Sequence, residues 1–96
     1  MKTASEILAI LQVKKPELER RFKVRRLALF GSFARGDQRD DSDIDILVDV
    51  DPSIGLDFVT LADELESTLG TRVDLVSTRA VKPRNWAHIE PDLIDV

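Results

Sequence analysis

Two aspartates near the middle of the chain, Asp43 and Asp45, have the residue type and the spacing to bind a divalent cation. Because side chains two residues apart in a β-strand project from the same face, their carboxylates should lie close together. At ~5 Å and an effective dielectric of ~20, two carboxylates repel each other by roughly 3 kcal/mol. A bound Mg²⁺ or Mn²⁺ would remove that repulsion, since both ions prefer oxygen ligands. An Asp-x-Asp pair alone, however, is more often the solvated face of an edge strand.

A third aspartate, Asp74, makes the cation-binding interpretation stronger. It lies in the apolar run Val73-Asp74-Leu75-Val76, where a charged side chain needs a reason unless that face of the strand is wet. Three carboxylates on strands form a more specific pattern than an isolated pair.

A Gly-Ser pair, Gly31-Ser32, follows the apolar run that ends at Phe30. Where a strand ends and a helical turn begins, backbone N–H groups are free, and glycine permits the close approach of a ligand. Phosphate oxygens would suit this turn, and Arg35 and Arg39 are near enough in sequence to help neutralise a triphosphate. An isolated Gly-Ser is more often only a tight turn with a cap residue.

Periodicity predicts the elements that must position these residues. Apolar residues at helical spacing predict helices over about 4–12 and 57–69, with Gly70 ending the second, and Pro16 suits the first turn of a further short helix. Short β-rich runs predict strands over 24–30, 44–50 and 73–76. The tail over 81–96 should form a short helix and an extended end that covers the sheet. We therefore expect a mixed α/β fold in which helices pack against a small sheet.

Length and composition limit the remaining possibilities. The 96 residues suffice for one modest core, so we expect a single domain over 1–96. The net charge of −4 makes nucleic acid an improbable direct partner. Apolar runs are too short for a membrane span, and the chain lacks a secretory signal and cysteine, so we expect a cytoplasmic protein without thiol chemistry.

The complete pattern resembles the minimal nucleotidyltransferase domains of the DNA polymerase β-like superfamily. Their hallmark is Gly-Ser, about ten residues, Asp-x-Asp and a third aspartate on a later strand. Here Gly-Ser-Phe-Ala-Arg-Gly begins at Gly31, and Ser-Asp-Ile-Asp ends at Asp45. The resemblance covers roughly 27–76 and implies a polymerase β-like nucleotidyltransferase fold.

The resemblance also implies roles for these residues. Asp43 and Asp45 would bind two Mg²⁺ ions, with Mn²⁺ as a substitute, and Asp74 would bind the catalytic ion and assist deprotonation of the attacking hydroxyl. Gly31 and Ser32 would hold the β- and γ-phosphates of ATP. The reaction would be an in-line displacement at the α-phosphate that releases pyrophosphate.

Short members of this family resemble antitoxins whose partner is a HEPN-type ribonuclease toxin. Such antitoxins transfer AMP from ATP to a toxin hydroxyl, usually that of a tyrosine. The principal alternative is a non-catalytic antitoxin that neutralises its partner by occlusion, although occlusion would not require three aspartates. Transfer to a small molecule or an RNA end would ordinarily need an additional domain. The chain could also form a homo-oligomer.

Overall fold

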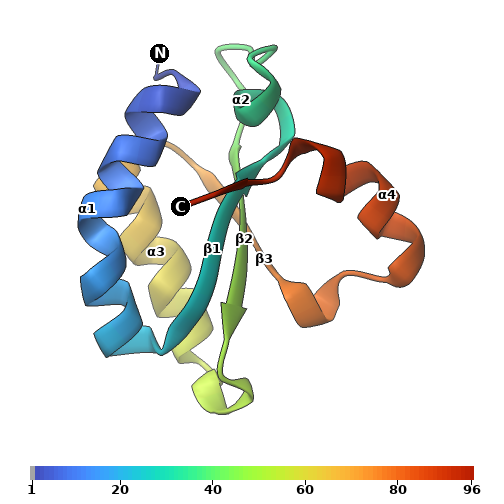
Figure 1. Ribbon diagram of the computed structural model, residues 1–96. Coiled ribbons are helices and arrows are strands. Elements are labelled where there is room, and N and C mark those ends of the chain that lie inside the picture. Colours follow the sequence, from blue (N-terminus) through green and yellow to red (C-terminus); the bar gives the residue numbers. More distant parts are fainter. Residues whose placement is uncertain (1) are drawn as a thin grey trace.

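The computed structural model describes residues 2–96, which form a four-stranded mixed sheet with helices on one face and a C-terminal arm on the other (Figure 1). The strands lie in the order β3-β2-β1-β4, with β2 and β3 parallel and the other pairs antiparallel. The predicted α/β class is therefore confirmed. The strands are β1 Val24–Phe30, β2 Ile44–Val50, β3 Val73–Ser77 and β4 Ile94–Asp95, and the α-helices are α1 Ala4–Phe22, α2 Gly31–Arg35, α3 Asp57–Leu69 and α4 Trp86–Ile89.

The N-terminal helix α1 is one continuous element, so the prediction of two shorter helices is wrong. Proline inside a helix removes a backbone hydrogen bond and costs about 3 kcal/mol. Pro16 nevertheless lies inside the helix, on its exposed face. On the opposite face, the apolar residues before and after Pro16 share one buried stripe, namely Ile7, Leu11, Leu18 and Phe22. Burial of that stripe holds both halves in register.

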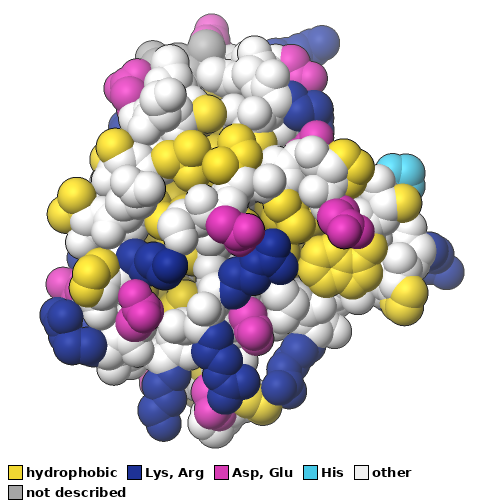
Figure 2. All heavy atoms as spheres, viewed as in Figure 1, with side chains coloured by type: hydrophobic (Ala, Val, Ile, Leu, Met, Phe, Trp, Pro, Cys, Tyr) yellow, Lys and Arg dark blue, Asp and Glu magenta, His cyan; other side chains and the backbone are white. Residues whose placement is uncertain are grey.

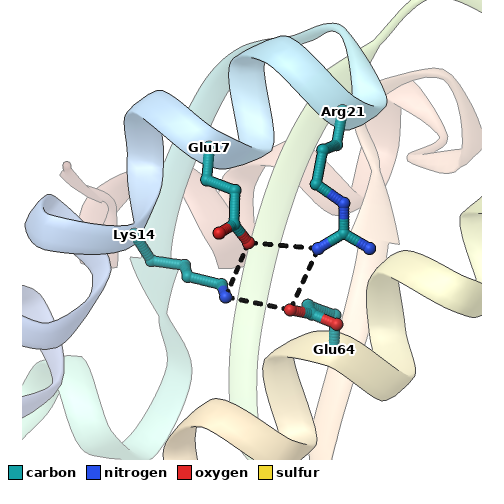
Figure 3. A network of polar contacts seen from close by, with 4 residues as sticks. All are labelled: Lys14, Glu17, Arg21 and Glu64. Carbon is teal, nitrogen blue, oxygen red and sulfur yellow. Dashed lines mark hydrogen bonds and ion pairs between the residues drawn. The ribbon is translucent and has the colours of Figure 1, made fainter.

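A charged network ties α1 to α3 across their outer surface (Figure 3). Lys14 Nζ lies 2.7 Å from Glu17 Oε2 and 2.9 Å from Glu64 Oε1. Arg21 Nη1 lies 3.1 Å from a carboxylate oxygen of each glutamate. We call these four residues the helix ion network. Its Lys14 and Glu17 flank Pro16 and so connect the two parts of α1.

The main core lies between the sheet and the two long helices. Ile44, Ile46 and Val48 of β2 are fully buried there, together with Leu61 and other leucines of the α3 stripe. The boundaries predicted for β1, β2 and α3 are confirmed, and Gly70 ends α3 with a left-handed φ of 67°. The third strand extends one residue beyond its prediction.

The opposite face of the sheet is covered in part by residues 78–93, which we call the C-terminal arm. Leu47 of β2 and Ala28 and Phe30 of β1 form a second core, on which Trp86 and other apolar residues of the arm pack. The arm then joins β4, which pairs with β1. The prediction of a short helix and an extended end covering the sheet is therefore confirmed. Within residues 2–96, no helix is both long and apolar enough to cross a membrane.

Candidate active site

The turn at Gly31 lies directly against the carboxylate of Asp45. Gly31 begins α2 at the end of β1 with a φ of 76°, a left-handed conformation that favours glycine. A Cβ atom at this position would lie 2.9 Å from Asp45 Cγ and closer still to Oδ2. Only a residue without a side chain therefore lets the Gly-Ser turn and the aspartate approach each other this closely.

Asp45 and Asp74 lie side by side on the face of the sheet that the arm partly covers. The parallel pairing of β2 with β3 places Asp45 in register with Asp74, and both project on the same side as Leu47. Burial, together with the charges of Asp74 and Asp43, raises the pKa of the half-buried Asp45 to about 6. A cation placed between these carboxylates would relieve both effects.

Asp43 lies just before β2 and pairs with Arg72, a residue that the sequence interpretation did not select. Arg72 Nε lies 3.2 Å from Asp43 Oδ1, and the two side chains are 73% and 45% exposed. Within residues 2–96, no three His, Cys, Asp or Glu side chains already surround one point closely enough to hold a metal ion. We call Asp43, Asp45 and Asp74 the aspartate cluster. Its Asp45 and Asp74 are brought together, whereas Asp43 is held by Arg72.

The carboxylates nevertheless have the chemistry that a divalent cation requires. They are oxygen ligands on or next to neighbouring strands, and the raised pKa of Asp45 reflects its burial first and then the negative charges of Asp74 and Asp43, which Arg35 offsets only in part. The space that a Cβ would occupy at Gly31 is filled by the Asp45 carboxylate, which fixes that ligand beside the turn. The cluster therefore fits Mg²⁺ or Mn²⁺.

The other predicted nucleotide ligands lie around the same turn. Ser32 is half-buried in α2, and its carbonyl accepts hydrogen bonds from the N–H groups of Gly36 and Asp37. Arg39 is exposed, and its side chain makes no ion pair within the described residues. Its backbone N–H donates to Ser42 Oγ over 2.8 Å and so braces the loop that leads to Asp43.

Arg35 connects α2 to the C-terminal arm. Its Nη1 donates to Asp92 Oδ2 over 2.6 Å, and its Nε donates to Asp37 over 3.1 Å. Arg35 is also near enough to Asp45 to lower the pKa of that carboxyl slightly, against the larger effect of burial. Asp92 is thus a second neighbour of the site that the sequence did not reveal, because nothing in the spacing joins it to Arg35. Arg72 had a weak signal, since it lies two residues before Asp74.

A polar pocket of about 520 Å³ adjoins the loop that carries Asp43, next to the start of α1. It is lined by Lys2, Glu6, Phe33, Asp40, Ser42 and Thr71. None of the aspartate cluster lines it, because those three side chains belong to the sheet and its edge. The aspartate cluster therefore lies outside this pocket, on the sheet face that also carries the second core.

The nucleotidyltransferase domain family matches residues 11–95 of this chain. The chain is also 49% identical over 84 residues to the protein adenylyltransferase MntA of Thermococcus cleftensis, covering 85% of this chain and 84% of the relative.

Two solved structures resemble the fold. A candidate minimal nucleotidyltransferase is 33% identical with a TM-score of 0.83, covering 99% of this chain and 97% of that one. The second is the complex of tri-AMPylated Shewanella oneidensis HEPN toxin with an MNT antitoxin, matched at 26% identity and a TM-score of 0.59. That match covers 96% of this chain and 66% of the other.

Proposed function

The chain belongs to the nucleotidyltransferase domain family, and from this membership we propose that it transfers AMP from ATP to a hydroxyl group of a partner protein. The partner that we propose is a HEPN-type toxin, which the transfer would silence, with this chain as its antitoxin. The observation that carries the proposal is the contact of Asp45 with the Gly31 turn beside Asp74. That contact puts carboxylates for a cation next to a turn suited to phosphate.

Nucleotidyltransferases generally use divalent metal ions, and we propose two Mg²⁺ ions held by Asp43, Asp45 and Asp74. When bound, such ions neutralise the triphosphate and stabilise the entering and leaving oxygens of the displacement. Asp45 would serve in its ionised form, which a pKa of about 6 permits at neutral pH. Before an ion binds, Arg72 would keep the Asp43 carboxylate oriented. On binding, Asp43 would give up its contact with Arg72 and contact the ion instead.

The residues around the turn would bind and orient the nucleotide. Gly31 and Ser32 would donate hydrogen bonds to the β- and γ-phosphates, because the turn leaves backbone N–H groups available at the end of β1. Arg35 and Arg39 would add positive charge beside the phosphates. Of these two, Arg39 is the freer, since Arg35 is already paired with Asp92 and Asp37.

In the transfer itself, the bond between the partner's hydroxyl oxygen and the α-phosphorus forms while the bond from the α-phosphorus to the β-bridging oxygen breaks. Pyrophosphate leaves, and the hydroxyl proton passes to Asp74 and from there to water. Asp74 is suited to this task because it is exposed on the sheet face beside Asp45. Positioning and charge neutralisation would supply most of the rate.

We also propose that residues 1–96 act as one nucleotidyltransferase domain. In support of this, the family match begins inside α1, and α1 packs on the same core as the strands that carry the aspartates. A partner protein would then supply the rest of the acceptor site.

The test is label transfer. The chain is incubated with Mg²⁺, its cognate HEPN-type toxin and ATP labelled at either the α- or the γ-phosphate. Adenylyl transfer predicts that the α-label appears on the toxin and that the γ-label appears only in pyrophosphate. Label on the toxin from γ-labelled ATP would mean phosphoryl transfer and would refute the proposal.

Two variants test whether AMP transfer depends on the aspartate cluster. Asp43→Ala/Asp45→Ala should abolish transfer, whereas Asp49→Asn, on the same face of β2 but beneath the arm, should preserve it. If the double variant still neutralises the toxin without labelling it, occlusion is the function instead. If it still transfers label, the residue assignment is wrong.

A further inference from the structure

The C-terminal arm carries a concentrated positive charge in a protein that is negative overall. Residues 78–89 contain Arg79, Lys82 and Arg84 and no acidic residue, whereas the whole chain has a net charge of −4. All three side chains are exposed. We call these three residues the basic strip. Figure 2 shows Lys or Arg side chains at the right edge and at the lower right of the molecule, near the place of the arm in Figure 1, with hydrophobic side chains between them.

The basic strip differs from several other basic residues in making no ion pair, a property that it shares with Arg20, Lys23 and Arg39 among the described residues. In the part of the chain that the structure describes, Arg25 pairs with Asp51, Arg26 with Asp95 and Arg35 with Asp92. Lys14 and Arg21 are paired in the helix ion network. Within residues 2–96, no member of the basic strip makes an ion pair, so its charge is not used to hold the fold together.

The arm that carries the strip borders the face where the aspartates lie. Trp86 and Ile89 pack on the second core, whose Leu47 is two residues beyond Asp45 on the same face of β2. At its far end, Asp92 binds Arg35 of α2 over 2.6 Å. The arm therefore runs from the end of β3, where Thr78 contacts Asp49, to α2 beside the Gly-Ser turn, and the basic strip lies in the part of the arm that follows β3.

We propose that the basic strip docks an acidic surface of the protein that carries the acceptor hydroxyl. This inference rests on the proposed function, since it names the surface by which the protein substrate is held. Half-buried Trp86 and Ile89 and the exposed Ala80, Pro83 and Ala87 lie among the charges. An apolar patch with charges at its margin has the composition of a protein interface.

A nucleic acid fits this surface less well than a protein does. Three cations can neutralise only a few phosphates, and the affinity of proteins for nucleic acid comes largely from such contacts. The segment 37–51, which contains two of the three clustered aspartates, carries seven aspartates and one arginine, and would repel a polyanion lying across the same face. An acidic patch of limited size on a protein meets the strip without meeting that segment.

The test uses two variants of equal charge change in the full chain. Lys82→Glu/Arg84→Glu reverses two charges of the strip. Arg20→Glu/Lys23→Glu reverses one arginine and one lysine at the end of α1, which are exposed and unpaired among the described residues. Nucleotide-free binding to the cognate HEPN-type toxin is measured by stopped flow at low and high salt, with thermal unfolding as the check on folding.

At low salt, the strip variant should associate with the toxin at least tenfold more slowly than wild type, and the control variant within about twofold of it, because charges at an interface steer association. High salt should remove most of the difference. An unchanged association rate, an equal loss in the control, or a salt-independent loss would each overturn the inference.

Separate readouts distinguish this inference from the proposed function. If wild type binds the toxin through the strip but transfers no AMP, the docking inference holds and the proposed function fails. If transfer occurs and reversing the strip changes neither association nor the KM for toxin, the docking inference fails alone. If the strip variant bound the toxin as wild type does but lost binding to a labelled single-stranded RNA, the strip would be assigned to nucleic acid and the docking inference would be overturned.

Discussion

Opposite charges alternate in the helix ion network between α1 and α3, whereas like charges gather in the aspartate cluster on the sheet. In the network, hydrogen bonds from Lys14 and Arg21 hold the pKa values of Glu17 and Glu64 below their usual range. In the cluster, burial and neighbouring carboxylates raise the pKa of Asp45 to about 6. The ionised form is thus favoured at the first site and opposed at the second.

The difference indicates what each charged group does. The helix ion network compensates its own charge, so it needs nothing from outside the chain. The aspartate cluster costs stability and is completed only by a cation, which is typical of sites kept for function. Removing a charge from the helix ion network should therefore lower stability and leave activity unchanged. Removing a charge from the aspartate cluster should raise the stability of the metal-free protein and lower activity.

The largest expected effect is that of Asp45→Asn. Removing this charge should lower AMP transfer by about 10³-fold, because a ligand of the catalytic ions contributes several kcal/mol to the transition state. The same change should raise the melting temperature of the metal-free protein, since it removes a charge that burial and then repulsion from Asp74 and Asp43 disfavour. Transfer assays and thermal unfolding in EDTA measure the two effects. If Asp45→Asn lowered the melting temperature in EDTA, this result would contradict the comparison between the aspartate cluster and the helix ion network.

A substitution at Gly31 should act on the same contact from the other side. Gly31→Ala would push a methyl group into the Asp45 carboxylate, so transfer should fall about 10²-fold through misplacement of that ligand. Gly36→Ala is the matched control, because Gly36 has a similar φ of 82° but nothing within 4 Å of an added Cβ. It should cost only the ~1 kcal/mol of a left-handed alanine and retain activity. Equal losses in the two variants would show that backbone conformation alone matters.

Activity should depend on the protonation of Asp45. As pH falls through about 6, protonation of this carboxyl removes a cation ligand, so transfer at limiting Mg²⁺ should fall about tenfold per unit below that value. The stability of the metal-free protein should instead be greater at low pH than at neutral pH. Because the folded-state pKa is raised, the folded protein binds the extra proton, and stability present below pH 4 is lost as pH rises through about 6. A pH profile that is unchanged in Asp45→Asn would assign the decline to another group.

The smallest effect is expected in the helix ion network. Glu64→Gln should lower the melting temperature by a few degrees at low salt and by less at high salt, since exposed ion pairs are weak and screened. Transfer of AMP should stay within about twofold of wild type, because no member of the network touches the aspartate cluster. Thermal unfolding and the transfer assay at two salt concentrations check this. A large loss of activity would mean that the two regions are coupled.

Sequence reasoning succeeded where a local pattern determines the structure. Alternation along β2 predicted which side of the strand carries Asp45, and the apolar stripe with Gly70 predicted the end of α3. The Gly31 turn was found because glycine and strand end coincide there. The roles of the predicted ligands stay predictions, as does the cytoplasmic location.

The features that sequence reasoning missed depend on contacts between distant residues. Burial on both sides of Pro16 keeps α1 continuous, although the local propensity of proline predicts a break. The contact of Arg35 with Asp92 joins residues 57 apart in the chain. Arg72 reaches Asp43 only because β3 lies beside β2. None of these contacts follows from spacing alone.

The most direct test of the aspartate cluster is thermal unfolding of wild type, Asp45→Asn and Asp49→Asn with Mg²⁺ and the non-hydrolysable ATP analogue AMP-PNP. A ligand that binds only the folded state raises the melting temperature. We predict a rise of several degrees for wild type and Asp49→Asn, reversed by EDTA, and no rise for Asp45→Asn. An equal rise in all three proteins, or none in wild type, would contradict the assignment of a cation and nucleotide site to these aspartates.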